Sequence, residues 1–180
     1  MKQEVLTRYM VISDIHGSSS AFKAVMKRYK REQATHLLIA GDITARHSET
    51  LARDLNSMRN HITAVQGNCD TSWEEQVLRF PIPTFVEFKM ADRTIFLTHG
   101  NLMTPSRPPV LPPGSIFVSG HTHRPDVSFL PDPHLYLLNP GSIAFPRGDN
   151  PPSYGIITEK GLEVRDLYHS RLLHHISFKK

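Results

Sequence analysis

Short apolar runs recur along the chain, and each ends in glycine or in a polar residue. Five runs share this format, each with a hydrophobic stretch of four to six residues: YMVISDIHG, HLLIAGD, ITAVQGNCD, RTIFLTHG and SIFVSGHTH. Near-continuous apolar runs are typical of strands that are buried on both faces of a sheet. The pattern therefore predicts five buried strands, each of which delivers polar groups to a loop.

Helical periodicity fills the gaps between the first three runs. In SSSAFKAVMKRYKRE, apolar residues recur every three to four positions, with Ser18 to Ser20 as candidate N-caps. SETLARDLNSMRN repeats this design with Ser48 as its cap. The order strand, helix, strand, helix, strand predicts a parallel half-sheet with right-handed crossovers.

The pattern changes after Thr84 and becomes rich in strands. TFVEFKM and RTIFLTHG are joined by Ala91-Asp92, and SYGIITEKGLEVRDLYHS turns around Lys160-Gly161, so two hairpins are expected. RLLHHISFKK is expected to be a final edge strand or a frayed tail, and the proline-rich TPSRPPVLPP a loop. Pro125 is expected to end regular pairing after the fifth run. We therefore expect an α/β fold in which a two-sheet sandwich is flanked by helices.

Length and composition narrow the class of protein. A chain of 180 residues with 39% hydrophobic and 21% charged positions is typical of one globular domain, here expected to span residues 1–180. No apolar run approaches the roughly 20 residues that cross a bilayer, and MKQEVLTRYMVISD does not resemble a secretory signal. We therefore expect a cytoplasmic protein that does not bind membranes. The single cysteine excludes an internal disulfide framework and a thiolate-only zinc site.

Unusual polar residues follow all five runs. They are Asp14, His16, Asp42, Asn68, His99, His121 and His123. In an open α/β sheet the carboxyl ends of the strands converge on one edge, so these side chains are expected to meet there. Carboxylate, amide and imidazole donors together suit Mn, Fe, Co or Zn better than Mg or Ca. Seven donors are too many for one tetrahedral ion and are about right for two ions that share a bridging carboxylate.

The motifs that carry these residues resemble a known family. D-I-H-G (14–17), G-D (41–42), G-N-C-D (67–70), T-H-G (98–100) and G-H-T-H (120–123) are similar, in this order, to the calcineurin-like metallophosphoesterases. The G-N-C-D form and a later N-P-G-S (139–142) are closest to the small YfcE-type phosphodiesterases. The resemblance covers about residues 8 to 165. It implies the metallo-dependent phosphatase fold, in which two sheets lie between helical layers.

The resemblance also implies a role for each donor. It assigns one metal ion to Asp14, His16, Asp42 and His123, and the other to Asp42, Asn68, His99 and His121, so that Asp42 bridges. Two ions ~3.5–4 Å apart would lower the pKa of a shared water to ~7 and supply a hydroxide nucleophile without a protein nucleophile. The expected reaction is hydrolysis of a small phosphodiester, with Mn²⁺ as the expected metal and Zn²⁺, Fe²⁺ or Co²⁺ as alternatives.

Other residues near these motifs have less defined roles. Larger relatives carry a histidine, which protonates the leaving group, where this chain has Cys69; a thiol is a poor substitute, so good leaving groups are expected to react faster. The alternative for Cys69 is a small buried residue in a tight turn. Arg46 is a candidate for contacting substrate phosphate. Asp70 is expected either to orient Asn68 or to cap the following turn.

Three alternatives remain open. The same site could serve a nuclease or a phosphomonoesterase. A nucleic-acid track needs aromatic platforms, and the sequence shows no obvious aromatic ladder beside the basic residues Lys27, Arg28, Lys30 and Arg31 of the first predicted helix. The fold also occurs in the small subunit of the retromer coat, a non-catalytic scaffold. The edge segment TFVEFKM could pair in a homo-oligomer.

Overall fold

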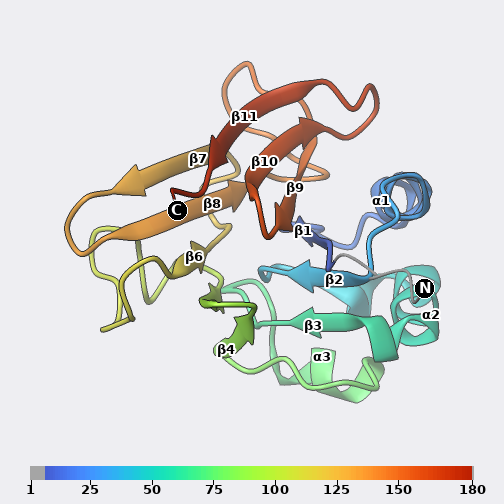
Figure 1. The fold of residues 1–180 in the computed structure, drawn as a ribbon. Helices are drawn as coiled ribbons and strands as arrows, with labels where there is room; N and C mark the ends of the chain where they lie inside the picture. Colours follow the sequence, from blue (N-terminus) through green and yellow to red (C-terminus); the bar gives the residue numbers. More distant parts are fainter. Residues whose placement is uncertain (1–6, 180) are drawn as a thin grey trace, which may run out of the picture.

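The computed structural model describes residues 7–179 and arranges them as two β-sheets with helices packed against one of them (Figure 1). The part of the secretory-signal prediction that concerns residues 1–6 lies outside the described residues. Within residues 7–179, no helix combines the length and apolar character that spanning a membrane requires.

The first sheet joins the parallel half to the C-terminal hairpin. Its six strands lie in the order β11 (Leu172–Ser177), β10 (Gly161–Asp166), β9 (Ser153–Thr158), β1 (Tyr9–Ile12), β2 (His36–Ile39) and β3 (Ile62–Ala64). β1 pairs with β2 and β2 with β3 in parallel, whereas β9 runs antiparallel to β1. The predicted parallel half, the hairpin and the final edge strand are therefore all confirmed.

The second sheet is mixed in the same way. Its five strands lie in the order β4 (Phe85–Met90), β5 (Arg93–Thr98), β6 (Ile116–Val118), β8 (Leu135–Pro140) and β7 (Pro125–Leu130). The β4–β5 hairpin is as predicted. The expectation for Pro125 is wrong, because Pro125 begins β7 and pairs with Pro140 of β8. β7 lies at the sheet edge, where the first residue of a strand does not need to donate a hydrogen bond.

Within residues 7–179, three α-helices connect the parallel strands and the two sheets. They are α1 (Ser19–Arg31), α2 (Glu49–Ser57) and α3 (Ser72–Val77), with 3₁₀ turns at Ala45–His47 and Arg59–His61. Ser18 and Ser48 cap α1 and α2 as predicted, because each side chain accepts a hydrogen bond from a first-turn amide. The sequence reading missed α3, whose six residues are too few to show a helical period. Its start is fixed by a capping box between Thr71 and Glu74.

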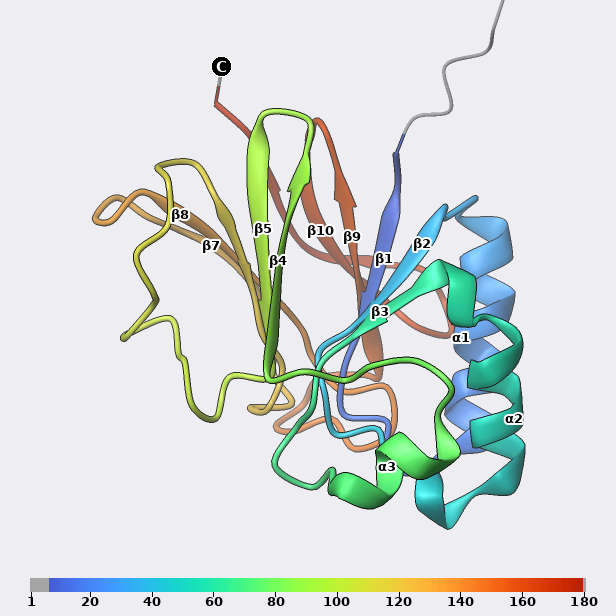
Figure 2. The same ribbon diagram turned by 90° about the horizontal axis from the view of Figure 1, so that it is seen from below.

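The layers explain where the apolar side chains are buried. Figure 2 shows α1 and α2 on one side of the first sheet and the second sheet on the other. One core lies under the helices, around Phe22, Leu37 and Leu51, and a second lies between the sheets, around Val11, Leu38 and Val118. The predicted α/β sandwich is confirmed.

In the described residues, the outer face of the second sheet is not covered by the helical layer that the family resemblance implies. Phe96 and Phe117 on this face pack against Leu111 and Met103, which belong to the proline-rich connection between β5 and β6. Proline lacks the amide donor that a helix interior needs. An irregular segment therefore covers this face in the described part of the chain.

Candidate metal centre

The predicted donors lie in five loops at one edge of the molecule. Each loop follows the carboxyl end of β1, β2, β3, β5 or β6, and Figure 2 shows these loops meeting at the lower edge. Parallel pairing of β1 with β2, of β2 with β3 and of β5 with β6 gives the strands of each sheet a common carboxyl edge. The predicted convergence is confirmed.

Asp14, His16 and His123 form the first group of donors. His123 Nε2 lies 3.1 Å from Asp14 Oδ1 and 3.4 Å from His16 Nε2, and His16 Nε2 lies 3.8 Å from Asp14 Oδ1. These three atoms are close enough together to share one cation. The group is mostly buried, with the Asp14 side chain fully inaccessible.

Asp42, Asn68 and His99 form the second group. His99 Nε2 lies 3.0 Å from Asn68 Oδ1 and 3.4 Å from Asp42 Oδ2. The His121 ring packs edge to face on the His99 ring, with centroids 5.1 Å apart. Asp42 Oδ2 also lies 3.7 Å from His16 Nε2, so this carboxylate stands between the two groups.

Backbone carbonyls orient the two buried imidazoles. His99 Nδ1 lies 2.7 Å from Ala40 O, and His123 Nδ1 lies 2.6 Å from Phe145 O. A carbonyl oxygen only accepts, so Nδ1 donates in both residues and Nε2 of the neutral ring carries a lone pair. Nε2 is the atom that faces the carboxylates, and an N–H bonded to a carbonyl is the usual arrangement of a metal-binding histidine.

The chemistry of the donor set fits a cation. Asp14 Oδ1 is buried and has no hydrogen-bond donor among the described residues, although it faces the Nε2 lone pair of His123 at 3.1 Å. Two electron-rich atoms at this distance repel each other unless a positive charge lies beside them, and burial adds to the cost of an unpartnered carboxylate. A divalent ion at this position would satisfy both atoms.

The pKa shifts of Asp14, Asp42 and His99 reflect the same need for positive charge at the site. Burial raises the pKa of Asp14 above its usual range. Burial also opposes ionisation of Asp42, but hydrogen bonds from His99 and from the Cys69 amide hold its pKa well below the ordinary value. Burial lowers the pKa of His99, yet contacts with Asp42 and Ala40 O outweigh it and raise that pKa overall. Both shifts have the same cause, which is the attraction between the Asp42 carboxylate and a positive charge beside it.

Backbone conformation at the donors is strained. Five non-glycine donors have positive φ: Asp14 (55°), His16 (46°), Asp42 (52°), His121 (66°) and His123 (59°). Each such residue costs of order 1–3 kcal/mol and persists only where its surroundings enforce it. Such strain clusters at functional sites, so this concentration at one edge independently marks the loops as functional.

Hydrogen bonds between loops hold this conformation. The buried Asp70 carboxylate accepts from the Thr44 amide at 2.8 Å and from the Gly67 amide at 2.9 Å. Asp70 therefore ties the loop after β2 to the loop after β3. Within residues 7–179 the Asp70 carboxylate makes no hydrogen bond to Asn68, and the side chain that caps α3 is that of Thr71.

The N-P-G-S motif (139–142) forms hydrogen bonds with the loops that carry the donors. Asn139 Nδ2 donates to Gly120 O at 2.8 Å and to Thr122 Oγ1 at 3.0 Å, and Ser142 Oγ donates to Asp14 O at 2.8 Å. The motif therefore fixes the loops that carry Asp14 and His121.

Cys69 and Arg46 lie beside the donors. The half-buried Cys69 thiol is close to His16 and Asp42, and burial together with the Asp42 charge raises its pKa to about 11. Arg46 Nη1 donates to both carboxylate oxygens of the buried Glu74 at 2.8 Å and to Cys69 O at 3.1 Å. Arg46 thus has a structural partner, and its role as a substrate contact stays a prediction.

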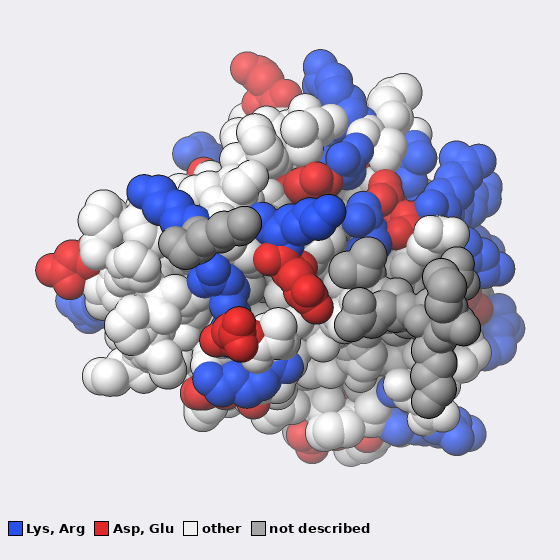
Figure 3. Space-filling view, in the orientation of Figure 1, with Lys and Arg blue, Asp and Glu red and all other residues white. Residues whose placement is uncertain are grey.

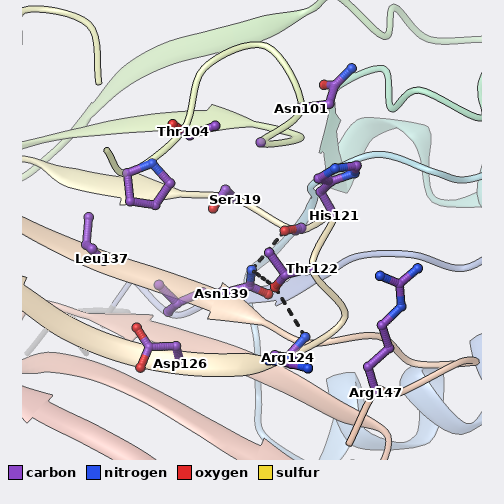
Figure 4. Close-up of a pocket in the computed structure, with 14 residues that line it drawn as sticks. Asn101, Thr104, Ser119, His121, Thr122, Arg124, Asp126, Leu137, Asn139 and Arg147 are labelled. Carbon is purple, nitrogen blue, oxygen red and sulfur yellow. Dashed lines mark hydrogen bonds between the residues drawn. The ribbon is translucent and has the colours of Figure 1, made fainter. Parts of the chain in front are cut away.

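The sequence reading missed the residues that line a cavity beside His121. Among them are Asn101, Arg124 and Arg147, which come from loops after β5, β6 and β8 (Figure 4). Arginines in loops far apart in the chain have no periodic signature, so only the folded arrangement brings them together.

Comparison with known proteins identifies the family. A model of the calcineurin-like phosphoesterase superfamily domain matches residues 8–161. Phosphodiesterase YfcE of Escherichia coli K12 is 32% identical over 170 residues, which cover 88% of this chain and 91% of that protein. A solved structure of YfcE, described as a phosphoesterase from E. coli, has a TM-score of 0.90 at 30% identity and covers 96% of this chain and 100% of that one.

A more distant structure shares the fold alone. Vacuolar protein sorting 29 from Cryptosporidium parvum has a TM-score of 0.68 at 21% identity, with 97% of this chain and 99% of that chain covered. The match to the family model and the similarity to YfcE both span most of the chain. The protein therefore belongs to the calcineurin-like phosphoesterase superfamily, as a phosphate-ester hydrolase of the YfcE type.

Proposed function

We propose that the protein is a dinuclear-metal phosphodiesterase that cleaves small phosphodiesters. The observation that carries this proposal is the position of Asp42, whose carboxylate lies between a group containing His16 and a group containing His99. One carboxylate shared by two donor groups suits two cations held close together. Phosphodiesters are proposed as substrates because the similar E. coli protein is a phosphodiesterase by name.

In this proposal each donor group holds one divalent ion. Asp14, His16, Asp42 and His123 would hold the first ion, and Asp42, Asn68, His99 and His121 would hold the second. The unpartnered Asp14 Oδ1 and the fixed tautomers of His99 and His123 support the assignment. The mixture of oxygen and nitrogen donors favours Mn²⁺, with Zn²⁺, Fe²⁺ or Co²⁺ as alternatives.

The side chains of the protein would bind the metal ions, and backbone carbonyls would keep the metal-binding rings in position. When bound, a pair of divalent ions supplies Lewis acidity and a water of lowered pKa. Asp42 keeps its negative charge at neutral pH because its pKa is depressed. The carbonyls of Ala40 and Phe145 keep the Nδ1 protons of His99 and His123 in place, so that neither ring rotates. No side-chain nucleophile is needed.

Cys69 limits the choice of leaving group. A thiol whose pKa lies near 11 transfers a proton poorly at neutral pH to an alkoxide that departs beside it. Diesters whose leaving groups depart without protonation, such as aryl esters, are therefore proposed to react much faster than dialkyl esters.

The rival activities are less well supported. Figure 3 shows Lys and Arg dispersed among acidic and neutral residues on the face drawn, with a concentration at the edge where α1 lies. Arg28 of that helix donates to the carbonyls of Leu167 and Tyr168, so part of the basic cluster is structural. A nuclease needs a continuous basic track with aromatic platforms. Cytoplasmic location and homo-oligomerisation stay predictions.

One experiment tests the function and separates its rivals. Metal-depleted protein is reloaded with Mn²⁺ or Zn²⁺, bound metal is counted, and hydrolysis of bis(p-nitrophenyl) phosphate, dimethyl phosphate, p-nitrophenyl phosphate and single-stranded DNA is compared. We expect two ions per chain and fastest cleavage of the aryl diester. Asn68→Ala and His99→Ala should abolish that cleavage, while His174→Ala, an exposed residue of β11, should retain it.

Each rival predicts another result. Preference for p-nitrophenyl phosphate would indicate a phosphomonoesterase, and preference for DNA a nuclease. Absence of bound metal and of all hydrolysis would indicate a scaffold. Equal rates on aryl and alkyl diesters would contradict the proposed effect of Cys69.

A further inference from the structure

A cavity of about 630 Å³ adjoins the candidate metal centre on the side of His121. Its lining includes Gly100 and His121, which lie in the loops that carry the second donor group, and also Leu137 and Pro105. Its size falls in the range of sites for small molecules and exceeds what one phosphate group needs. If the reacting phosphate lies at the metal centre, this cavity is where one arm of the diester extends.

Two arginines give the cavity its charge. Arg124 and Arg147 both line it, and within residues 7–179 neither guanidinium has a carboxylate within 4.0 Å. The one acidic residue of the lining is Asp126, whose Oδ2 accepts a hydrogen bond from Ser128 Oγ at 2.8 Å. The lining is therefore net positive.

Arg147 is held next to the metal-binding loops. Its amide donates to His123 O at 3.1 Å, which fixes the start of the side chain beside a donor residue. In Figure 4 the side chain extends toward the side of the cavity on which His121 lies.

These features complement an anion rather than a neutral group. Guanidinium groups bind carboxylate, phosphate or sulfonate through paired hydrogen bonds, and two of them without carboxylate partners create a site of unsatisfied positive charge. We propose that the natural substrate is a phosphodiester whose arm carries a second anionic group, which Arg124 and Arg147 bind in this cavity. This inference rests on the proposed function, because it requires a diester at the metal centre.

The test compares two ligands that differ in one charge. Binding of methyl 2-sulfoethyl phosphate and of methyl propyl phosphate to Mn²⁺-loaded protein is measured by calorimetry. A sulfonate is chosen because it is a poor ligand for divalent cations and so does not compete for the metal. We expect the sulfonate to bind about tenfold or more tightly, as charge-assisted hydrogen bonds to arginine imply.

Substitutions in the cavity test whether the tighter binding of the sulfonate depends on its arginines. In the double variant Arg124→Gln/Arg147→Gln, the ratio of the two dissociation constants should fall toward one. Arg53→Gln, an exposed arginine of α2, is the matched control and should leave the ratio unchanged. Asp126→Asn removes the negative charge of the lining and should raise the ratio. Hydrolysis of bis(p-nitrophenyl) phosphate is followed in the same preparations.

Three results would overturn the inference. They are a wild-type ratio near one, a ratio that survives loss of both arginines, and an equal weakening of both ligands, which would mean that the arginines contact the reacting phosphate. Hydrolysis with a ratio near one refutes the second-anion site but not the proposed function. A ratio of ten without hydrolysis refutes the proposed function and leaves only an anion-binding site.

Discussion

At the scale of single residues, the site depends on close contacts that leave no space for extra atoms. The loop after β3 passes so near Asp42 that a Cβ on Gly67 would lie 2.2 Å from both the Asp42 amide nitrogen and Asp42 Oδ1. The same glycine amide donates to Asp70. Gly67 therefore permits the approach that brings Asn68 and Asp42 into one site.

Replacing Gly67 by alanine should weaken metal binding strongly and lower the stability of the fold moderately. We expect Gly67→Ala to lower the free energy of unfolding by about 1–3 kcal/mol, because the added methyl forces backbone shifts in a packed region. Displacement of Asp42 should weaken Mn²⁺ binding at least tenfold. Urea denaturation and metal titration measure the two effects.

Gly148→Ala is the matched control for this change. Gly148, unlike Gly67, has a positive φ, at 68°, and its added Cβ would meet only Asn150 Nδ2, at 3.6 Å. This variant should show a backbone cost of about 1–2 kcal/mol and unchanged Mn²⁺ affinity. Normal metal affinity in Gly67→Ala would show that the close approach is not required.

At the scale of elements, an ion pair between two short helical segments holds the loops in register. Arg46 lies in the 3₁₀ turn that follows Asp42, and Glu74 lies in the first turn of α3, which follows Asn68. Both oxygens of the fully buried Glu74 accept from Arg46 Nη1 at 2.8 Å, and Glu74 Oε2 also accepts from the Thr71 amide at 2.9 Å. The pair therefore fixes the spacing between the segments that follow two donors.

Glu74→Gln should destabilise the protein in a pH-dependent way. Burial alone would raise the Glu74 pKa, but hydrogen bonds from the Thr71 amide and Arg46 lower it below its ordinary 4.5. Its contribution is therefore fully present above about pH 4.5 and is lost as pH falls through the lower folded pKa. We expect a loss of about 2–4 kcal/mol at pH 7 that shrinks below pH 4.5, as measured by urea denaturation at several pH values.

The partly exposed pair between Glu163 and Arg165, at 2.7 Å, is the control. Glu163→Gln should cost less than about 1 kcal/mol, because solvent screens this pair. Equal losses in the two variants would mean that the Glu74 pair has no special role in holding the loops.

The same elements show what the sequence could predict. The five strand ends were predictable because an apolar run followed by a polar residue recurs along the chain. The starts of α1 and α2 were predictable because Ser18 and Ser48 are typical N-cap residues. The short helix α3 and the strand that begins at Pro125 were not predictable, because a local capping box and a sheet-edge position decide them. The cavity around Arg147 depends on contacts between loops remote in sequence.

At the scale of the whole molecule, interactions across layers hold the two sheets and α1 together. Glu32 at the end of α1 accepts from Arg8 Nη2 at 2.6 Å and from the Tyr154 hydroxyl of β9 at 2.8 Å. Beyond β11, Phe178 packs under the Arg93 guanidinium, 4.1 Å from the ring centroid, beside Tyr136 of the second sheet. The C-terminal segment thus reaches from one sheet to the other, so we expect the two sheets around the candidate metal centre to unfold together.

Metal binding should therefore stabilise the entire protein. The donors come from segments spread between Asp14 and His123, so an unfolded chain cannot gather them, and the ion binds the folded state alone. The folded state without metal carries the cost of the unpartnered Asp14 carboxylate, which a cation removes. At a Mn²⁺ concentration about 100 times the dissociation constant, the gain is about 2.7 kcal/mol. For a domain of this size it should raise Tm by about 5–10 °C.

Calorimetric scans with EDTA and with Mn²⁺ measure this shift. Asn68→Ala removes one exposed donor without opening the core, so the variant should fold and show at most half of the wild-type rise in Tm. His174→Ala removes an exposed histidine of β11 and should show the full rise, which separates the site from adventitious binding to surface imidazoles. An equal rise in both variants would mean that Mn²⁺ stabilises the chain elsewhere. Under that result the convergence of donors at the sheet edge would not be a metal centre.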